Sequence, residues 1–150
     1  MFNVMATLAN HLPAREVSAH CDGPCGVYDP ASARIAAEAV VSMAKKLVDA
    51  GPATTLEEQN TQSRYIAIKE HEAQTAKDQL LILWTDYFKP QHLEAYPDLH
   101  TTFWNAAKAA SAAKVHASVE TAEALLAAVE EIHGIFWASK GRDDAWVTAS

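Results

Sequence analysis

The sequence contains little of the material from which small secreted scaffolds and membrane spans are built. Only two of its 150 residues are cysteines, too few for a framework of disulfides. No apolar run reaches the roughly 18 residues that a membrane-spanning helix needs. Lysine and arginine number 12 against 19 acidic residues, and the formal charge of −7 argues against nucleic acid or an anionic membrane as a partner.

Glycine and proline are also scarce, with five and six residues, whereas alanine is abundant. This composition favours helices over sheets, and no stretch of any length shows the alternation typical of a strand. Apolar residues make up 49% of the chain, which excludes a disordered protein, and 150 residues suffice for one domain with a modest core. We therefore expect one all-α domain.

The periodicity of the apolar residues predicts four helices. The first spans about residues 30–49 and the second about 56–87, where the early part is also compatible with a loop. The third begins near Pro97, after a connection at 89–96, and the fourth runs from Ser118 to Gly141. The predicted core positions, helix by helix, are Ile35, Ala39, Val40, Met43 and Leu47; Leu80, Leu83, Trp84, Tyr87 and Phe88; Leu99, Phe103, Ala106, Ala110 and Ala113; and Leu125, Val129, Ile132 and Phe136.

Residues with known helix-capping preferences lie at these boundaries. Asp29 is a predicted N-cap with a proline at the first helical position, and Gly51 followed by a proline predicts the end of the same helix. Residues 54–57 offer a capping-box start for the second helix, and Ser118 an N-cap for the fourth. Four helices with mostly short connections predict an antiparallel four-helix bundle.

Both cysteines lie in residues 20–30, which read HCDGPCGVYDP. His20 directly precedes Cys21, and the glycines and proline beside the thiols allow the backbone to curl tightly. The segment could form a disulfide, run thiol redox chemistry, or hold a metal. The gap from Cys21 to Cys25 differs from the C-x-x-C of thioredoxin-like sites, and the second cysteine pair of a typical zinc site is missing. Spacing alone leaves a metal site and a disulfide or inert thiols about equally favoured.

The whole segment resembles the metal-binding hook of nickel-containing superoxide dismutases, HCxxPCGVYDP. The resemblance continues in LWTDYFKP at residues 83–90, YPDLH at 96–100 and IFW at 135–137, and covers about residues 20–140. It implies an oxidoreductase that converts superoxide to dioxygen and hydrogen peroxide by Ni(II)/Ni(III) cycling. It also implies a four-helix bundle, as the periodicity does independently, assembled as a homohexamer.

The resemblance further implies a ligand set for the nickel ion. The in-plane donors are the amine of His20, the amide nitrogen and thiolate of Cys21, and the thiolate of Cys25. The His20 imidazole is the axial ligand of the oxidised state. Square-planar nitrogen and sulfur donors suit divalent nickel. Thiolate and deprotonated amide donors are strong and favour the trivalent state. A coordinated thiolate is also held deprotonated, which helps to explain how cysteine is tolerated in an oxidising reaction.

A free amine on His20 requires that the residues before it are removed. We therefore expect residues 1–19 to be a propeptide cut off by a processing protease. Residues 20–150 then form the superoxide dismutase domain, with its hook at 20–28. A disordered start is the plainer alternative for residues 1–19. These residues make a poor secretory signal, which favours a cytoplasmic location, with export coupled to processing as the alternative.

Tyr28 and Tyr87 match the family's tyrosines beside the metal, where they would hold solvent and restrict access to small species. Without the resemblance, Tyr87 fits an ordinary core aromatic residue equally well. Lys89 is a candidate for attracting superoxide, although a lone lysine is more often simply solvated. These three residues are the predicted surroundings of the metal.

The chain departs from the family at two positions. Ala36 and Glu72 stand where a glutamate and an arginine orient the axial histidine, and neither can play the original role. Glu72 could instead accept a hydrogen bond from His20. The histidines after the hook lack the spacing of a helical metal pair, and we expect them to be surface or half-buried residues: His71, His92, His100, His116 and His133.

Two other functions compete with the enzyme. One is a nickel- or copper-binding or trafficking bundle that uses the same hook without turnover. The other is a structural helical protein with an unprocessed, metal-free hook. The enzyme and the trafficking protein both depend on Cys21 and Cys25, and they differ in whether the bound metal reacts with superoxide. The sequence assigns no role to the tail, residues 142–150.

Overall fold

The structure is a computed structural model that describes residues 26–149, so the predicted propeptide and the three hook ligands His20, Cys21 and Cys25 lie outside the described residues. The elements in order are α2 (Ala31–Ala50), α3 (Leu56–Ile82), the π-helical turn η1 (Leu83–Tyr87), α4 (Pro90–Ala95), α5 (Leu99–Val115) and α6 (Val119–Ser139). The all-α fold class is confirmed. Within this range, every helix falls short of the length or apolar character that spanning a bilayer requires.

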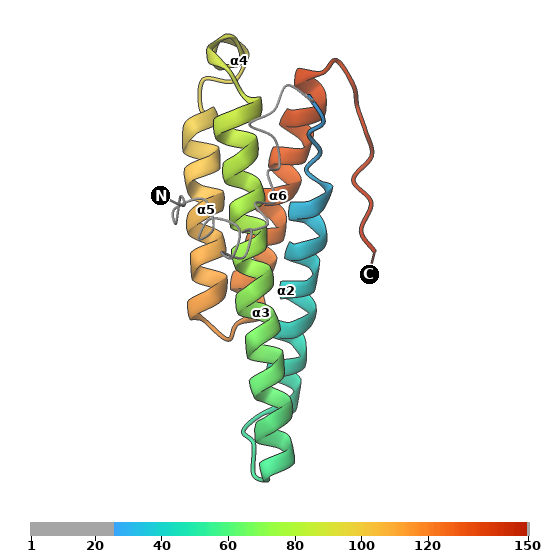
Figure 1. Ribbon diagram of the computed structural model, residues 1–150, viewed down its shortest axis with the longest axis vertical. Helices are drawn as coiled ribbons and strands as arrows, with labels where there is room; N and C mark the ends of the chain where they lie inside the picture. The colour runs from blue at the N-terminus through green and yellow to red at the C-terminus, as the bar shows by residue number, and fades with distance from the viewer. Residues whose placement is uncertain (1–25, 150) are drawn as a thin grey trace, which may run out of the picture.

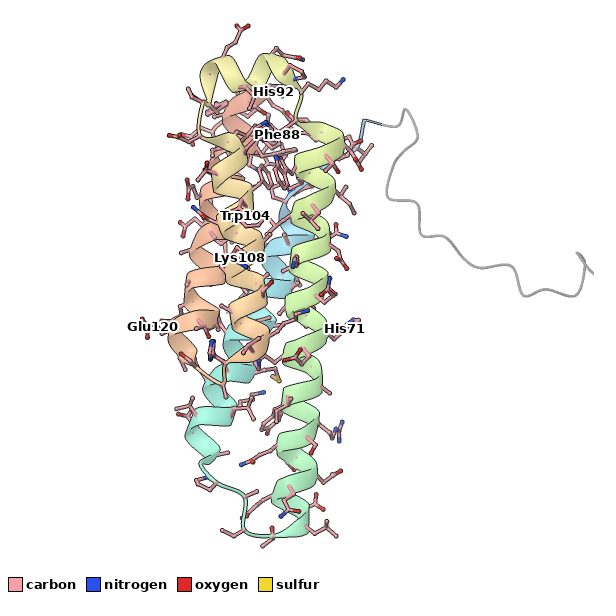
Figure 2. The ribbon with its side chains drawn as sticks, turned by 90° about the vertical axis from the view of Figure 1, so that its left-hand side faces the viewer. His71, Phe88, His92, Trp104, Lys108 and Glu120 are labelled. Carbon is pink, nitrogen blue, oxygen red and sulfur yellow. The ribbon has the colours of Figure 1, made fainter. Side chains whose placement is uncertain are left out.

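The four long helices lie side by side in alternating directions (Figure 1). α2 packs against α3 and α6, and α5 packs against the same two helices, so each long helix borders the shared core. The tip of the α2–α3 hairpin extends beyond the α5–α6 connection, and α4 lies at the opposite end of the bundle (Figures 1 and 2). This arrangement confirms the predicted antiparallel four-helix bundle.

The cores of α5 and α6 follow the predicted pattern. All five predicted positions of α5, from Leu99 to Ala113, are buried, and so are all four predicted positions of α6. Ser118 caps α6 as expected, because its hydroxyl accepts a hydrogen bond from the N–H of Thr121. Burying a leucine or phenylalanine side chain is worth about 1.5–3 kcal/mol, so these rows supply much of the driving force for folding.

The buried face of α2 differs from the prediction. Val40 is buried as expected, but Ile35 is 57% exposed, and Ala39, Met43 and Leu47 are only partly buried. Most of the buried residues of α2 are small, since small side chains let neighbouring helices approach closely: Ala33, Ala36, Ala37, Glu38, Val40, Val41 and Ala44. The face of α2 that is buried is therefore the one with the small side chains. The larger apolar side chains Ile35, Met43 and Leu47 lie nearer the surface.

The start of α2 is one residue later than predicted. The helix begins at Ala31, with the buried Pro30 in the N-cap position. The Asp29 carboxylate still does the work expected of it, because its Oδ1 accepts a hydrogen bond from the N–H of Ala31 at 2.8 Å. Gly51 ends the helix in a positive-φ conformation (62°), as the Gly-Pro signal predicts.

α3 is helical from its first turn, so the alternative of an early loop is wrong. The capping box lies one residue later than the predicted 54–57: Thr55 and Glu58 form it, and each side chain binds the other residue's backbone N–H. The predicted connection at 89–96 contains the short helix α4, which the sequence analysis missed. Six residues are too few to show a helical period.

The C-terminal tail folds back along the bundle beside α6 and α2 (Figure 1). The guanidinium of Arg142 lies 4.3 Å from the ring centroid of Trp137, and Nε2 of His133 is 3.0 Å from the carbonyl oxygen of Asp144. At its end, the backbone N–H of Ala149 donates to the carboxylate of Glu38, which also binds Arg34. The tail is thus tied to two helices.

Candidate metal centre

The described residues begin at Gly26, within the predicted hook at 20–28 and directly after its last ligand in the sequence, Cys25. Two residues after Gly26, the ring of Tyr28 packs against the ring of Tyr87, with 5.6 Å between their centroids. Tyr28 precedes α2 and Tyr87 ends η1, so packing of the bundle brings together two residues that are distant in sequence. Both predicted site tyrosines therefore share one location.

A pocket of about 510 Å³ lies at this end of the bundle. Its lining comes from the last residues of the hook, from η1, and from the start of α4 with the residue before it: Gly26, Tyr28, Asp86, Tyr87, Lys89, Gln91 and His92. It combines two phenol rings with one carboxylate, one ammonium group and one imidazole. Such a mixture of a few polar groups and aromatic walls suits a small polar species.

The turn η1 places Tyr87 and Asp86 on this pocket. The N–H of Phe88 donates to the carbonyl of Leu83 at 3.1 Å, five residues back, which closes the wide ring of a π-helix. Oγ1 of Thr85 lies 2.8 Å from both the Leu81 carbonyl oxygen and the Asp86 carboxylate, so its single proton can be donated to either acceptor. Such turns inside longer helices often mark functional sites, because the extra residue re-aims the side chains that follow.

Tyr87 is held by an aromatic cluster and one hydrogen bond. Its ring contacts those of Phe136 and Phe88, with centroid separations of 4.6 and 4.9 Å. Its hydroxyl is 2.7 Å from Oγ of Ser139, the last residue of α6. The ammonium group of Lys140 lies 5.3 Å from the centre of the Tyr87 ring. The orientation of this phenol is thus fixed by two residues of α6, by Lys140 directly after α6 and by Phe88 directly after η1.

His92 forms another wall of the pocket. Its ring stacks on Tyr87, with centroids 5.7 Å apart and planes inclined by 14°. Its Nδ1 accepts a hydrogen bond from the N–H of Lys89 at 2.9 Å, so the ring proton of the neutral imidazole resides on Nε2. Figure 2 shows His92 and Phe88 together at the α4 end of the bundle. The side chain of Lys89 is exposed on the same pocket.

Ala36 and Glu72, the two positions at which the sequence departs from the pattern it resembles, lie on neighbouring helices. Ala36 is 2% exposed on α2, and Glu72 is half-buried on α3. The predicted hydrogen bond from Glu72 to His20 involves a residue outside the described range and stays a prediction. The buried carboxylate of α2 is instead Glu38, bound to Arg34 and the tail. The four-residue spacing of Arg34 and Glu38 was the available sequence signal.

The other histidines are exposed or half-buried, as predicted. His71, His100 and His116 are exposed, and His133 is half-buried against the tail. His100 accepts a hydrogen bond on Nδ1 from Trp84 at 2.8 Å. Between residues 26 and 149, no three histidine, cysteine, aspartate or glutamate side chains are grouped as metal ligands.

Comparison with known proteins decides the family. The family model of nickel-containing superoxide dismutase matches residues 15–140. The superoxide dismutase [Ni] of Streptomyces seoulensis is 46% identical over 128 residues, which cover 85% of this chain and 93% of the relative. The corresponding enzyme of Streptomyces coelicolor is 45% identical over the same shares. The chain belongs to the nickel-containing superoxide dismutase family.

Solved structures of the family agree with the fold. A crystal structure of a Ni-containing superoxide dismutase after partial X-ray-induced reduction has a TM-score of 0.73 and 46% identity, covering 81% of this chain and 99% of its own. A native nickel superoxide dismutase structure gives the same TM-score at 43% identity and the same coverage. The predicted family, the oxidoreductase class and the nickel cofactor are confirmed. The tail after residue 140 lies beyond the match to the family model.

Several residues of the pocket were not predicted from the sequence. Asp86 lies within the LWTDYFKP motif and Gln91 and His92 directly follow it, so their closeness to Tyr87 in the chain was the signal that could have found them. Ser139 had no such signal, because it reaches Tyr87 only through the packing of α6 against η1.

Proposed function

We propose that the protein disproportionates superoxide at a nickel ion held by its hook, beside the pocket of Tyr28 and Tyr87. One observation carries this proposal: Gly26, the residue directly after Cys25, lines that pocket. The chain therefore continues toward the hook donors from a point where two aromatic walls, an ammonium group and an imidazole meet. A non-catalytic metal carrier, the alternative function, would have no need for a pocket of this kind beside its metal.

The donor set fits nickel. The amine and imidazole of His20, the amide and thiolate of Cys21 and the thiolate of Cys25 would hold the ion, as nitrogen and sulfur donors suit a tetragonal site. Nickel bound in this way would supply a one-electron couple between its divalent and trivalent states. Two solved structures of Ni-containing superoxide dismutase have Ni ligation corresponding to the oxidised state and to the state after partial X-ray-induced reduction, which supports a ligand set that responds to redox state in that family.

The residues of the pocket have distinct tasks in this proposal. Two superoxide ions and two protons give one dioxygen and one hydrogen peroxide, so the site must admit a small anion and supply protons. The exposed ammonium of Lys89 attracts the anion at the pocket of an otherwise acidic chain. Tyr28 and Tyr87 narrow the approach with their packed rings. Nε2–H of His92, the Lys89 ammonium, the Gln91 amide and water can donate hydrogen bonds there.

The active form is proposed to begin at His20. An amide bond to Ala19 would replace the basic amine by a far weaker donor, so a processing protease must remove residues 1–19. We propose a cytoplasmic location for the processed enzyme, because residues 1–19 make a poor secretory signal. Cell fractionation that recovers the processed protein outside the cytoplasm would contradict this location.

Substitution of the thiols tests the proposal. Cys21→Ser and Cys25→Ser in the processed chain should each lower superoxide decay to the background, because a serine hydroxyl has a far higher pKa than a thiol and is a harder donor. Helicity should persist, since the bundle core lies elsewhere. Superoxide decay, nickel content and far-ultraviolet circular dichroism are measured on both variants beside the wild type. A variant with near-native rates would sink the thiolate mechanism.

A further inference from the structure

The hydrogen bond between Tyr87 and Ser139 has a direction that its neighbours determine. The two hydroxyl oxygens are 2.7 Å apart, and either could be the donor if the pair stood alone. Ser139 also lies 2.6 Å from the carbonyl oxygen of Phe136, three residues earlier in α6. A carbonyl oxygen only accepts, so the single hydroxyl proton of Ser139 belongs to that contact.

The end of α6 makes this assignment necessary. In a continuing helix, the carbonyl of Phe136 would accept from the N–H of Lys140, four residues later. Here that N–H donates to the carbonyls of Trp137 and Ala138 instead, as the helix ends at Ser139. The hydroxyl of Ser139 therefore satisfies one of the carbonyls that a helix end leaves without a partner. Turning its proton toward Tyr87 would leave two oxygens 2.6 Å apart with no proton between them.

We infer that Ser139 is a positioning residue that commits the phenol proton of Tyr87 to α6 and away from the pocket. The order of donation is Tyr87 to Ser139 to the Phe136 carbonyl. The Tyr87 oxygen keeps its lone pairs as acceptors, and its O–H is already used. This inference rests on the proposed function, because its consequence concerns superoxide chemistry in the pocket.

As a consequence, the groups of the pocket differ in whether they accept or donate hydrogen bonds. A phenol without a free proton accepts hydrogen bonds from water or from a peroxide O–H, but it offers none to superoxide. Tyr87 therefore holds protonated species and solvent, and the anion is met by other donors of the pocket, among them the ammonium of Lys89 and Nε2–H of His92. Direct proton donation from Tyr87 to the substrate would first require the Ser139 contact to break.

Ultraviolet resonance Raman spectroscopy reads the direction of this bond without relying on activity. The intensity ratio of the tyrosine Fermi doublet separates donating from accepting phenols, and subtracting the spectrum of Tyr87→Phe isolates the signal of Tyr87. In the processed protein we expect a donor-type ratio for Tyr87. Ser139→Ala should shift this ratio toward the acceptor type, and Ser139→Thr, which keeps the hydroxyl, should preserve it.

Ser111→Ala is the matched control. Its hydroxyl also donates to a carbonyl of its own helix, that of Ala107, and accepts from another side chain, that of Lys77, but it lies on α5 away from Tyr87. This variant should leave the Tyr87 signal unchanged. In superoxide decay by the nickel-loaded protein, Ser139→Ala should lose about fivefold, the factor that one neutral hydrogen bond is worth, while Ser139→Thr and Ser111→Ala keep the wild-type rate.

The outcomes separate the inference from the proposed function. An acceptor-type ratio in the wild type, or no change in Ser139→Ala, would overturn the direction of the bond. A changed ratio with an unchanged rate would overturn the positioning role. A wild-type protein without dismutase activity would instead refute the proposed function, and the Raman ratio would still decide the direction of the bond.

Discussion

Lys89 is the described residue best placed to act on an anionic substrate before it reaches the hook. It is exposed, lines the pocket and directly follows Phe88, whose buried ring anchors the turn. One unit charge about 10 Å from an incoming anion in water is worth about 0.4 kcal/mol, or about a factor of two in local concentration. The effect is small and must depend on salt.

Replacing Lys89 should therefore change the rate modestly and in a salt-dependent way. We expect Lys89→Gln to lower the second-order rate of superoxide decay about twofold at low ionic strength, and to lose this difference when salt screens the charge. The measurement is pulse radiolysis over a series of salt concentrations.

Lys108→Gln is the control for this prediction, because it removes the same charge from an exposed lysine of α5, which lies over Trp104 along the side of the bundle (Figure 2). Equal losses from the two variants would mean that net charge, and not the position of Lys89, sets the effect.

Individual residues of the site could be predicted from the sequence where they belong to a recognisable motif. Tyr28 and Tyr87 were predicted from the family's segments, and the structure brings their rings into contact. Ser139 and Glu38 depend on partners that are distant in the chain, Tyr87 and Ala149, and no local pattern points to such pairs. A hydrogen bond between distant elements can be known only after the elements are packed.

Among the elements, the start of α3 carries a carboxylate with a clear pH response. Glu58 accepts from the N–H and hydroxyl of Thr54 at 2.7 and 2.8 Å, and from the N–H of Thr55 at 3.0 Å. These bonds, the backbone N–H of Thr54 foremost, lower the pKa of Glu58 below its ordinary value of 4.5. The capping box is thus strongest when Glu58 is ionised.

A pKa that is lower in the folded state stabilises the fold above the unfolded value, and this contribution is lost as the pH falls through the folded value. The thermal midpoint of the wild type should therefore fall on acidification below about pH 4.5 by more than that of Glu58→Gln. Circular dichroism melts at several pH values test this. Glu57→Gln, a change in the same turn at a residue that makes none of these bonds, should retain the acid sensitivity; equal curves for all three proteins would contradict the assignment.

The ends of the helices were predicted from the sequence more accurately than their buried faces were. Gly51, Ser118 and Gly141 mark ends that the structure confirms, because caps are local features. The predicted buried face of α2 was wrong at Ile35, since close packing of the helices favours alanine over larger apolar residues. The turn η1 was missed because one extra residue in a helix leaves the apolar spacing nearly unchanged.

For the whole molecule, the predicted homohexamer needs an apolar surface that a single chain leaves exposed. The alanines Ala106, Ala110 and Ala113 of α5 cannot supply it, because they are buried within the single chain. Apolar side chains are exposed instead on α2 and α3, part of them on the hairpin tip: Ile35, Val48, Leu56, Ile66 and Ile68.

We propose that these residues contribute to contacts between subunits. Ile66→Glu with Ile68→Glu should shift the processed protein to smaller species in sedimentation velocity, because a charge buried in an apolar contact is costly. The circular dichroism spectrum should be unchanged, since both side chains are exposed in the single chain. A wild type that sediments as a monomer at micromolar concentration would refute the oligomer.

The central claim is that a nickel ion on a free His20 amine, beside this pocket, disproportionates superoxide. The most direct test compares two forms of the wild-type chain, one beginning at Met1 and one beginning at His20, each supplied with nickel under reducing conditions. Intact mass, nickel content and superoxide decay are measured on the same samples. The account predicts bound nickel and rapid decay only for the chain that begins at His20; full activity in the chain that retains residues 1–19 would contradict it.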